Sequence, residues 1–414
     1  MTSPEHRIRT TTAVVRDAIG APLANHTVTV EQRRHNFGFG NIGFEFVALA
    51  NGEIGEAAGL DGAAARPLDR ASADATVALA ELWLDLFNQV TLPFYWRGFE
   101  PEPARPDTAR LLAAARWFAE RGVSAKGHPL VWHTLAPEWL LPLSDRDVEH
   151  VLRARVTREA RDFAGVIDHW DAINEAVILP RFTAEPNAIT RLSQSLGRVE
   201  MVRLAFETAR EANPHARLVL NDFLLTEEFA TLIEDCLAAG IRIDAIGLQT
   251  HMHQGFRGEE GLGAILESFA RFGLPLQLTE TTLVSGDLMP AHIVDLNDFQ
   301  PASWPSTPQG EDRQADELIR HYRLCTAHPL VESITYWGIS DKGAWLGAPA
   351  GLVRVDGSPK PAYDALHDLI KREWWLQPTT AITDAEGRVQ VSGWAGDYLV
   401  TPDAGAGPAV KVSI

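Results

Sequence analysis

Two glutamates stand at the ends of apolar runs that are typical of buried strands. Glu175 closes the run HWDAINE directly after Asn174, and Glu280 lies in the run LQLTETT. An ionised carboxylate is rarely buried without a partner, so a glutamate at the mouth of a buried strand needs an explanation. Two facing carboxyl groups, one protonated and one ionised, can cleave a glycosidic bond. The two glutamates therefore indicate glycoside chemistry, provided that the fold brings them together.

Other polar, titratable and aromatic residues follow the remaining apolar runs. They are His128, Trp132, His133, Asn221, Asp222, Gln249, His251, His253, Trp337 and Trp345. Indole rings offer flat apolar surface to the C–H faces of sugars. A phosphatase or nuclease would need lysine and arginine for its charged substrate, and few basic residues stand at these positions. The residue types favour a sugar substrate.

The elements that must position these residues alternate between strand-like and helix-like segments from Phe37 to Trp375. Eight short apolar runs are separated by stretches with helical period. The runs are Phe37–Gly43, Leu86–Phe94, Val123–Trp132, Ile167–Ile173, Leu218–Phe223, Ala245–Thr250, Leu276–Thr281 and Ser333–Ile339. Eight βα units predict an α/β fold, a (β/α)8 TIM barrel with its active site at the carboxyl ends of the strands.

The two ends of the chain follow a different pattern. Residues 1–36 and 376–414 alternate with period two around Asp-x-x-Gly turns, as β-hairpins do. Neither segment is long enough to bury a core alone. We therefore expect three parts: an N-terminal β segment (1–36), a catalytic barrel (37–375), and a C-terminal β segment (376–414). The two β segments would pack together as one small β-sandwich.

Six motifs between about Phe37 and Leu369 resemble glycoside hydrolase family 10 in order and rough spacing. They are GHPLVWH, WDAINEA, AFETAREANPHARLVLNDF, IDAIGLQTH, LQLTETT and YWGISDKGAW with GSPKPAYDAL. The resemblance implies an endo-β-1,4-xylanase-like enzyme that retains the anomeric configuration on a (β/α)8 barrel. It also implies that no cofactor and no metal are needed, and that the partner is a β-linked oligo- or polysaccharide.

The resemblance further implies a role for each residue at the strand ends. Glu175 would be the general acid/base and Glu280 the nucleophile. Asn174 would hydrogen-bond the 2-hydroxyl of the glycone, and His251 would orient Glu280 with Gln249 beside it. The residues lining the −1 region would be His128 and Trp132, with Trp337 as its floor and Trp345 toward the cleft.

One segment departs from the family pattern. After FNQVT the family carries Glu-Asn and then Lys-Trp, which bind the glycone, but this chain has LPFYWRGFEP. Arg97 could stand in for the lysine, although a planar guanidinium is not equivalent to an ammonium group. A tyrosine common in the family is replaced by Phe223. The substrate could be xylan, a decorated xylo-oligosaccharide or another β-glycoside.

Three alternatives follow from the same residues. His251 and His253 share a strand face and could belong to a metal-dependent barrel hydrolase, although a hydrogen-bonding network suits them better. The altered LPFYWR segment motivates a carbohydrate-binding barrel with little catalysis. A transglycosylase could use the same two carboxylates.

The charge composition of the chain restricts the classes of molecule that it is expected to bind. The chain has 414 residues with 37 basic and 55 acidic side chains, a net charge of −18. This excess argues against nucleic acid and against an anionic membrane surface as partners. The start MTSPEHRIRT has no apolar signal region, so we expect a cytoplasmic protein if the chain is complete, and a secreted one if a signal peptide was removed.

Two further features are expected. Cys236 and Cys325 lie far apart inside predicted helices and should be buried free thiols rather than a disulfide. The proline-containing stretch 283–309 has no clear period, and connections of that length are often functional, so we expect it to flank the active site.

Overall fold

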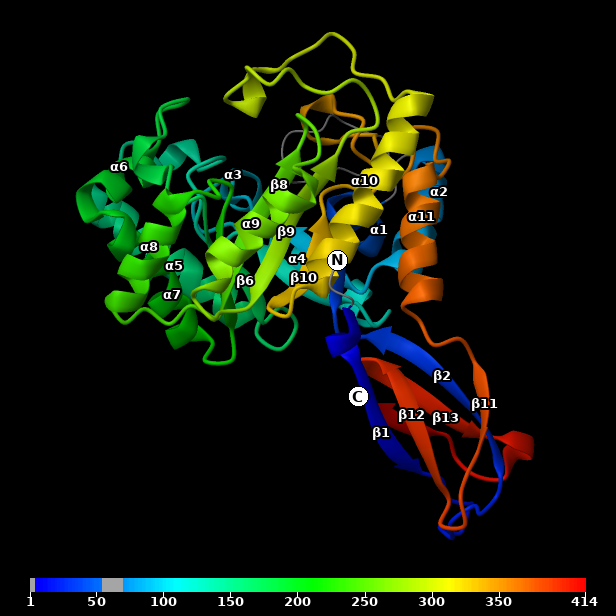
Figure 1. Ribbon diagram of the computed structural model, residues 1–414. Coiled ribbons are helices and arrows are strands. Elements are labelled where there is room, and N and C mark those ends of the chain that lie inside the picture. The colour runs from blue at the N-terminus through cyan, green and yellow to red at the C-terminus, as the bar shows by residue number, and fades with distance from the viewer. Residues whose placement is uncertain (1–3, 54–69) are drawn as a thin grey trace.

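Eight parallel strands form a closed barrel in the computed structural model, which describes residues 4–53 and 70–414. The barrel order is β10-β3-β4-β5-β6-β7-β8-β9, so each strand lies beside its sequence neighbour and β10 closes onto β3 (Figure 1). The strands are β3 (Gly38–Ile42), β4 (Gln89–Pro93), β5 (Ser124–His128), β6 (His169–Asn174), β7 (Arg217–Asp222), β8 (Ala245–Met252), β9 (Leu276–Leu283) and β10 (Val331–Tyr336). The predicted (β/α)8 barrel is confirmed.

Helices connect the strands and surround the barrel. They are α1 (Val47–Ala50), α2 (Arg70–Leu86), α3 (Trp96–Phe99), α4 (Thr108–Ala119), α5 (Asp145–Asp162), α6 (Ala188–Leu196), α7 (Arg198–Ala212), α8 (Glu227–Ala238), α9 (Gly258–Ala270), α10 (Pro308–Ala327) and α11 (Pro361–Asp368). Side-chain caps begin three of them. Ser144 accepts a hydrogen bond from an amide of α5, Asn187 from amides of α6, and Thr307 from one of α10.

The predicted strands Leu86–Phe94 and Val123–Trp132 extend several residues beyond the observed β4 and β5. Leu86 ends α2, and β4 begins only at Gln89. The prediction Val123–Trp132 runs past the end of β5, because Pro129 has no N–H to continue the ladder. Val131 still forms a single parallel bridge to Ile173. The chain after β5 therefore stays beside β6 and carries Trp132 toward the rim.

Close packing fixes the position of β5 against β6. Trp170 on β6 is fully buried, and a Cβ atom added at Gly127 would lie 2.1 Å from its indole ring. No residue other than glycine fits at such a distance without movement of the ring or the strand. The small residue at 127 thus holds the next residue, His128, at the barrel mouth.

The ends of the chain form two sheets below the barrel (Figure 1). β1 (Ile8–Val14) pairs with β12 (Arg388–Trp394), and the second sheet has the order β11-β2-β13-β14. The strands of that sheet are β2 (Thr27–His35), β11 (Thr379–Ile382), β13 (Gly396–Pro402) and β14 (Val410–Ser413). Their shared core contains side chains from both ends, among them Val15, Val28, Val30, Val391, Tyr398 and Val400. We call these two sheets the β appendage.

Arg7 links the β appendage to the base of the barrel. Its guanidinium donates hydrogen bonds to the carbonyls of Thr326, His328 and Val331, and it lies over the ring of Phe37. Val331 is the first residue of β10. The appendage is therefore attached at the amino ends of the strands, opposite the residues singled out for chemistry. The division at residues 36 and 376 stays our proposal.

Both cysteines are buried free thiols, as expected. Cys236 lies in α8 and Cys325 in α10.

Candidate active site

Glu175 lies immediately after β6 in a left-handed backbone conformation. Its φ angle is 56°, a region that residues other than glycine adopt infrequently and at a cost in energy. The amide of Glu175 donates to the carbonyl of Asn221 at 2.8 Å, and its own carbonyl accepts from Leu179. These bonds hold the turn, which directs the side chain of Glu175 to the barrel mouth.

A hydrogen-bond network joins Glu175 to Glu280. Asn221 Nδ2 lies 2.9 Å from Glu280 Oε1 and 2.7 Å from Asn174 Oδ1. Asn174 Nδ2 in turn donates to Glu175 Oε1 at 3.2 Å. Gln249 Nε2 donates to Asn174 Oδ1 at 3.0 Å and reaches Glu175 Oε1 at 3.5 Å. The two carboxyl groups therefore face one site, from barrel strands four and seven.

Burial makes Glu175 a carboxyl group that holds its proton near neutral pH. Its pKa is raised to about 8, first by burial and then by the negative charges of Glu280 and Asp222. Hydrogen bonds from Trp132 and Gln249 favour the anion and only partly oppose this shift. Glu175 can thus donate a proton at a pH where an exposed glutamate would be ionised.

Glu280 is held by donors on two neighbouring strands. Besides the bond from Asn221, His251 Nε2 lies 3.1 Å from Glu280 Oε2. The other nitrogen of His251 lies 3.2 Å from the hydroxyl of Thr282, which fixes the plane of the imidazole ring. Thr279 donates to Asn221 Oδ1 at 2.5 Å and fixes the orientation of that amide. The carboxylate oxygens of Glu280 are therefore positioned from both sides.

A buried ion cluster supports His128 beneath the site. His128 Nδ1 lies 2.7 Å from Asp171 Oδ2, and Lys126 Nζ lies 3.0 Å from Asp171 Oδ1. Burial by itself would raise the pKa of Asp171, but the charge of Lys126 and the bond from His128 hold it at about 2. A carboxylate ionised at every working pH keeps the His128 ring in one orientation.

Aromatic side chains surround the two glutamates. Trp132 Nε1 donates to Glu175 Oε2 at 2.9 Å. Trp337 meets the ring of His128 edge-on, with ring centroids 5.2 Å apart. Trp345 is 38% exposed, and its ring centroid lies 4.9 Å from that of His251. These indoles form the walls of the site, with Trp345 toward solvent.

The structure does not bring Arg97 into the network of the two glutamates. Its guanidinium pairs with Glu185 at 2.8 Å and donates to the carbonyl of Ala136. Tyr95 takes the position nearer the glutamates: its ring packs 5.5 Å from Trp132 and 5.7 Å from His128. Burial and the charges of Glu280, Glu175 and Asp171 raise its pKa well above the usual value, so Tyr95 stays a neutral phenol.

Burial lowers the pKa of two histidines at the rim, His253 and His133. His253 Nδ1 lies 3.5 Å from Thr282 Oγ1, and burial lowers its pKa to about 3. Burial also lowers the pKa of His133 to about 4. Within the part of the chain that the structure describes, no group of three or more histidine, cysteine or acidic side chains is arranged to hold a metal ion.

The stretch 283–309 follows β9 and leads into α10. In Figure 1 it arches above the barrel in yellow, and between the end of β9 at Leu283 and the start of α10 at Pro308 the structure has one short turn, η5 (Leu296–Asp298). Its amide at Met289 donates to the carbonyl of His253, and the ring of Trp304 lies 6.1 Å from that of His253. The segment therefore borders the outer side of the site next to Trp345.

Sequence reasoning missed the part played by two residues. Asn221 stood out only as a polar residue at the end of a strand, although it contacts both Asn174 and Glu280. Its position at the carboxyl end of a barrel strand was the signal available. Tyr95 lies in the segment LPFYWR that departs from the family pattern, and nothing in its sequence neighbours indicates that the charges of Glu280 and Glu175 act on its phenol.

The chain is similar in sequence to proteins that are named as endo-1,4-beta-xylanases. Endo-1,4-beta-xylanase 3 of Hypocrea jecorina is 29% identical over 285 residues, which cover 67% of this chain and 73% of the relative. Endo-1,4-beta-xylanase B of Thermotoga neapolitana is 26% identical over 298 residues, covering 67% and 78%.

The fold has close counterparts among solved structures. Xylanase 10B from Thermotoga petrophila RKU-1, in complex with xylobiose, matches with a TM-score of 0.62 at 21% identity over 82% of this chain and 95% of that one. In residues 4–53 and 70–414, none of the helices combines the length and apolar character needed to cross a bilayer.

The profile of glycosyl hydrolase family 10 matches residues 66–369. The resemblance read from the motifs is confirmed, and this chain belongs to glycosyl hydrolase family 10.

Proposed function

We propose that the protein is a retaining endo-β-1,4-xylanase that cleaves xylan or xylo-oligosaccharides by double displacement. The observation that carries this proposal is the network through Asn174 and Asn221 that joins the protonated Glu175 to Glu280. Family membership and the named activity of the relatives support the choice of substrate.

In the first step, Glu280 attacks the anomeric carbon and Glu175 protonates the departing glycosidic oxygen. The C1–O bond breaks as the bond from Glu280 to C1 forms, so a covalent glycosyl-enzyme results. In this proposal Asn221 and His251, which contact Glu280, orient the attacking carboxylate, and Asn174 binds a sugar hydroxyl beside it. Once the charge on Glu280 is consumed, its effect on the pKa of Glu175 disappears.

In the second step, Glu175 acts as a base. It takes a proton from water while the water oxygen attacks C1, and Glu280 leaves with its electron pair. Two inversions at C1 retain the configuration. A transglycosylase differs only in the acceptor, a sugar hydroxyl in place of water.

The roles of the surrounding residues belong to the same proposal. Trp132, Trp337 and Trp345 would hold sugar rings, with His128 at the glycone side. Since Arg97 is engaged with Glu185, we propose that Tyr95 supplies the hydroxyl that meets the glycone in place of the family's lysine. The compartment stays the prediction made from the sequence: cytoplasmic for a complete chain, secreted after removal of a signal peptide.

Substitution Glu280→Ala tests the proposal. We expect loss of aryl β-xylobioside hydrolysis by several orders of magnitude with the unfolding temperature retained, and rescue by azide to give an α-linked xylobiosyl azide. A panel of aryl β-xylobiosides, cellobiosides and glucosides fixes the sugar. Unchanged turnover in the variant, a β-linked azide product, or hydrolysis of glucosides alone would each refute the assignment.

A further inference from the structure

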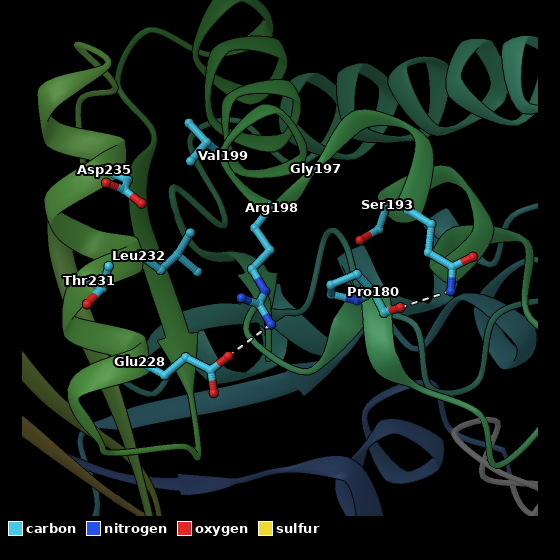
Figure 2. Close-up of a pocket in the computed structure, with 10 residues that line it drawn as sticks. Pro180, Ser193, Gly197, Arg198, Val199, Glu228, Thr231, Leu232 and Asp235 are labelled. Carbon is cyan, nitrogen blue, oxygen red and sulfur yellow. Dashed lines mark hydrogen bonds and ion pairs between the residues drawn. The ribbon is translucent and has the colours of Figure 1, made fainter.

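A second pocket lies outside the barrel mouth, between the ends of three helices. Residues of η4 (Leu179–Arg181), α6, α7 and α8 enclose a volume of about 580 Å3 (Figure 2). Volumes of this size suit a small ligand. Pro180 follows Glu175 by five residues in the loop after β6, so the pocket borders the loop that carries the acid/base.

One side of this pocket presents hydrogen-bond donors that lack acceptors. Ser193 is fully buried, and its hydroxyl has no hydrogen-bond partner among the described residues. Figure 2 shows this hydroxyl pointing toward the space between Pro180 and Arg198. The first turn of α7 begins at the same place, and its N-cap is Gly197, which has no side chain to accept from the free amides.

The N-terminus of α7 is open to the pocket. Gly197 has a φ of 84°, and a Cβ added there would meet nothing within 4 Å. The free amides and the positive end of the helix dipole favour an anion at this point. Arg198 adds a guanidinium whose buried Nε has no hydrogen-bond partner within residues 4–53 and 70–414, while its Nη2 donates to Glu228. Ser193, Arg198 and the amides of α7 thus form an unfilled donor set.

The opposite side of the pocket carries carboxylates. Glu228 accepts hydrogen bonds from both Arg181 and Arg198, so its charge is matched. Asp235 lies two turns further along α8 and is exposed, and it faces the pocket in Figure 2. A ligand in this pocket therefore meets donors at α7 and acceptors at α8.

Few classes of ligand can both accept hydrogen bonds from the donors of α7 and donate hydrogen bonds to the carboxylates of α8. A phosphate group would gain from the donors of α7, but its charge would be repelled by the exposed carboxylate of Asp235. A neutral sugar would bond the carboxylates through its hydroxyls and leave the donors of α7 without a charged acceptor. A uronic acid has a single carboxylate and several hydroxyls on one ring, and it meets both requirements.

We propose that this pocket binds a uronic-acid residue, with its carboxylate at Ser193 and the N-terminus of α7 and its hydroxyls at the carboxylates of α8. The proposal rests on the proposed function for the source of that residue, a uronic-acid side group of a decorated xylan chain bound across the cleft. Val199 and Leu232 supply the apolar surface for the sugar ring.

Calorimetric titration of the full chain at pH 7 tests the pocket directly. The probes are methyl β-D-glucuronoside, methyl β-D-xyloside and inorganic phosphate. We expect the glucuronoside to bind at least tenfold more tightly than either of the other two. Equal binding of the glucuronoside and the xyloside, tighter binding of phosphate, or no binding of the glucuronoside would overturn the proposal.

Two matched serine variants locate the binding. In Ser193→Ala, loss of a hydrogen bond to a charged ligand should weaken glucuronoside binding about tenfold or more. Ser195→Ala is the control, because that hydroxyl lies on the same helix but donates to Asp145 outside the pocket. Equal weakening in both variants, or none in Ser193→Ala, would contradict the assignment.

Asp235→Asn provides a second variant at an exposed position where folding should be retained. Removing this charge should weaken glucuronoside binding, because the sugar hydroxyls exchange a charged acceptor for a weaker neutral one. It should strengthen phosphate binding, because a repulsion is removed. The opposite pair of changes would refute the proposed orientation.

Hydrolysis of an aryl xylobioside by the wild-type protein separates this inference from the proposed function. Glucuronoside binding without hydrolysis would refute the xylanase proposal and support the uronate pocket. Hydrolysis without glucuronoside binding would refute the pocket alone.

Discussion

Both the backbone conformation and the surroundings of Glu175 lower the free energy of unfolding. Its backbone is left-handed, and its carboxyl group is buried close to two other acids, Glu280 and Asp222. Strain of this kind persists where the surrounding structure imposes it, and it is concentrated at functional sites. Burial disfavours the ionised form of Glu175 and therefore keeps its carboxyl group protonated. The residue that lowers the free energy of unfolding is thus also the residue that can donate a proton.

The pH dependence of the rate should report the proton on Glu175. Because a general acid must be protonated, kcat/KM should fall above about pH 8, the pKa of Glu175. Trp132 donates a hydrogen bond that favours the anion, so Trp132→Phe should move this limb to higher pH by about 1 unit or more. The measurement is a pH profile of aryl xylobioside hydrolysis.

Trp345→Phe serves as the control for that profile, since its indole packs on His251 rather than on Glu175. A limb that stays in place in Trp132→Phe, or moves to lower pH, would contradict the role of this hydrogen bond.

Replacing Glu175 should also change stability. Its pKa is about 8 in the folded protein and about 4.3 in an unfolded chain, so the folded state binds the proton more tightly. The group therefore costs no stability below about pH 4, and the cost grows as pH rises from there toward 8. Glu175→Gln stays neutral and should be more stable than wild type by about 1–3 kcal/mol at pH 8.

Urea unfolding at pH 4 and pH 8 measures this difference, which should be small at pH 4. The exposed Glu102→Gln is the control and should show little change at either pH. A variant that is less stable than wild type at pH 8 would show that burial of Glu175 carries no penalty.

The sequence identified the two glutamates and most of their neighbours, because strand ends in a barrel converge on one rim. The sequence alone could not show which partner a long side chain contacts. Arg97 pairs with Glu185, 88 residues away, and that partner is set by the packing of α3 against the loop that precedes α6. Asn221 contacts Asn174 on the adjacent strand β6 and reaches Glu280 on β9, two strands away in the barrel, which the residue type alone does not reveal.

At the scale of elements, β5 depends on a single glycine. In Gly127→Ala the new methyl group would lie 2.1 Å from the ring of Trp170, so the strand or the indole must move. We expect a loss of about 1–3 kcal/mol in unfolding free energy and a lower kcat, since His128 is the next residue. Denaturant unfolding and steady-state kinetics measure the two effects.

Gly263→Ala gives a matched control with the opposite sign. Gly263 lies within α9, and a Cβ there meets nothing within 4 Å. The change should stabilise the protein by up to about 1 kcal/mol, because alanine favours a helix over glycine. Equal losses in both variants would mean that contact with Trp170 is not the cause.

The elements themselves were largely predictable, and their limits were not. Eight apolar runs indicated eight strands because a parallel barrel buries both faces of each strand. The ends of the apolar runs do not coincide with the ends of the strands where apolar residues continue beyond the last hydrogen-bonded residue of the strand. Leu86 belongs to α2 and packs in the core, and Trp132 lies beyond β5, so both are hydrophobic for reasons other than strand pairing.

At the scale of the whole molecule, the β appendage should behave as one unit. β1 pairs only with β12 among the described strands, and β2 lies between β11 and β13. Deleting residues 376–414 should therefore remove protection from the amides of β1 and β2, while barrel strands such as β8 stay protected. Hydrogen exchange measures this. Full protection of β1 and β2 in the truncated chain would show that the N-terminal segment is stable alone.

The pairing of β1 and β2 with strands near the other end of the chain also has a consequence for biosynthesis. Ile8 lies opposite Trp394, so β1 leaves the ribosome long before its partner and can pair with it only after the barrel between them has been translated. Until then their edges are bare, and bare edges invite pairing with other nascent chains. Completion of the appendage is thus a later step than synthesis of the barrel strands.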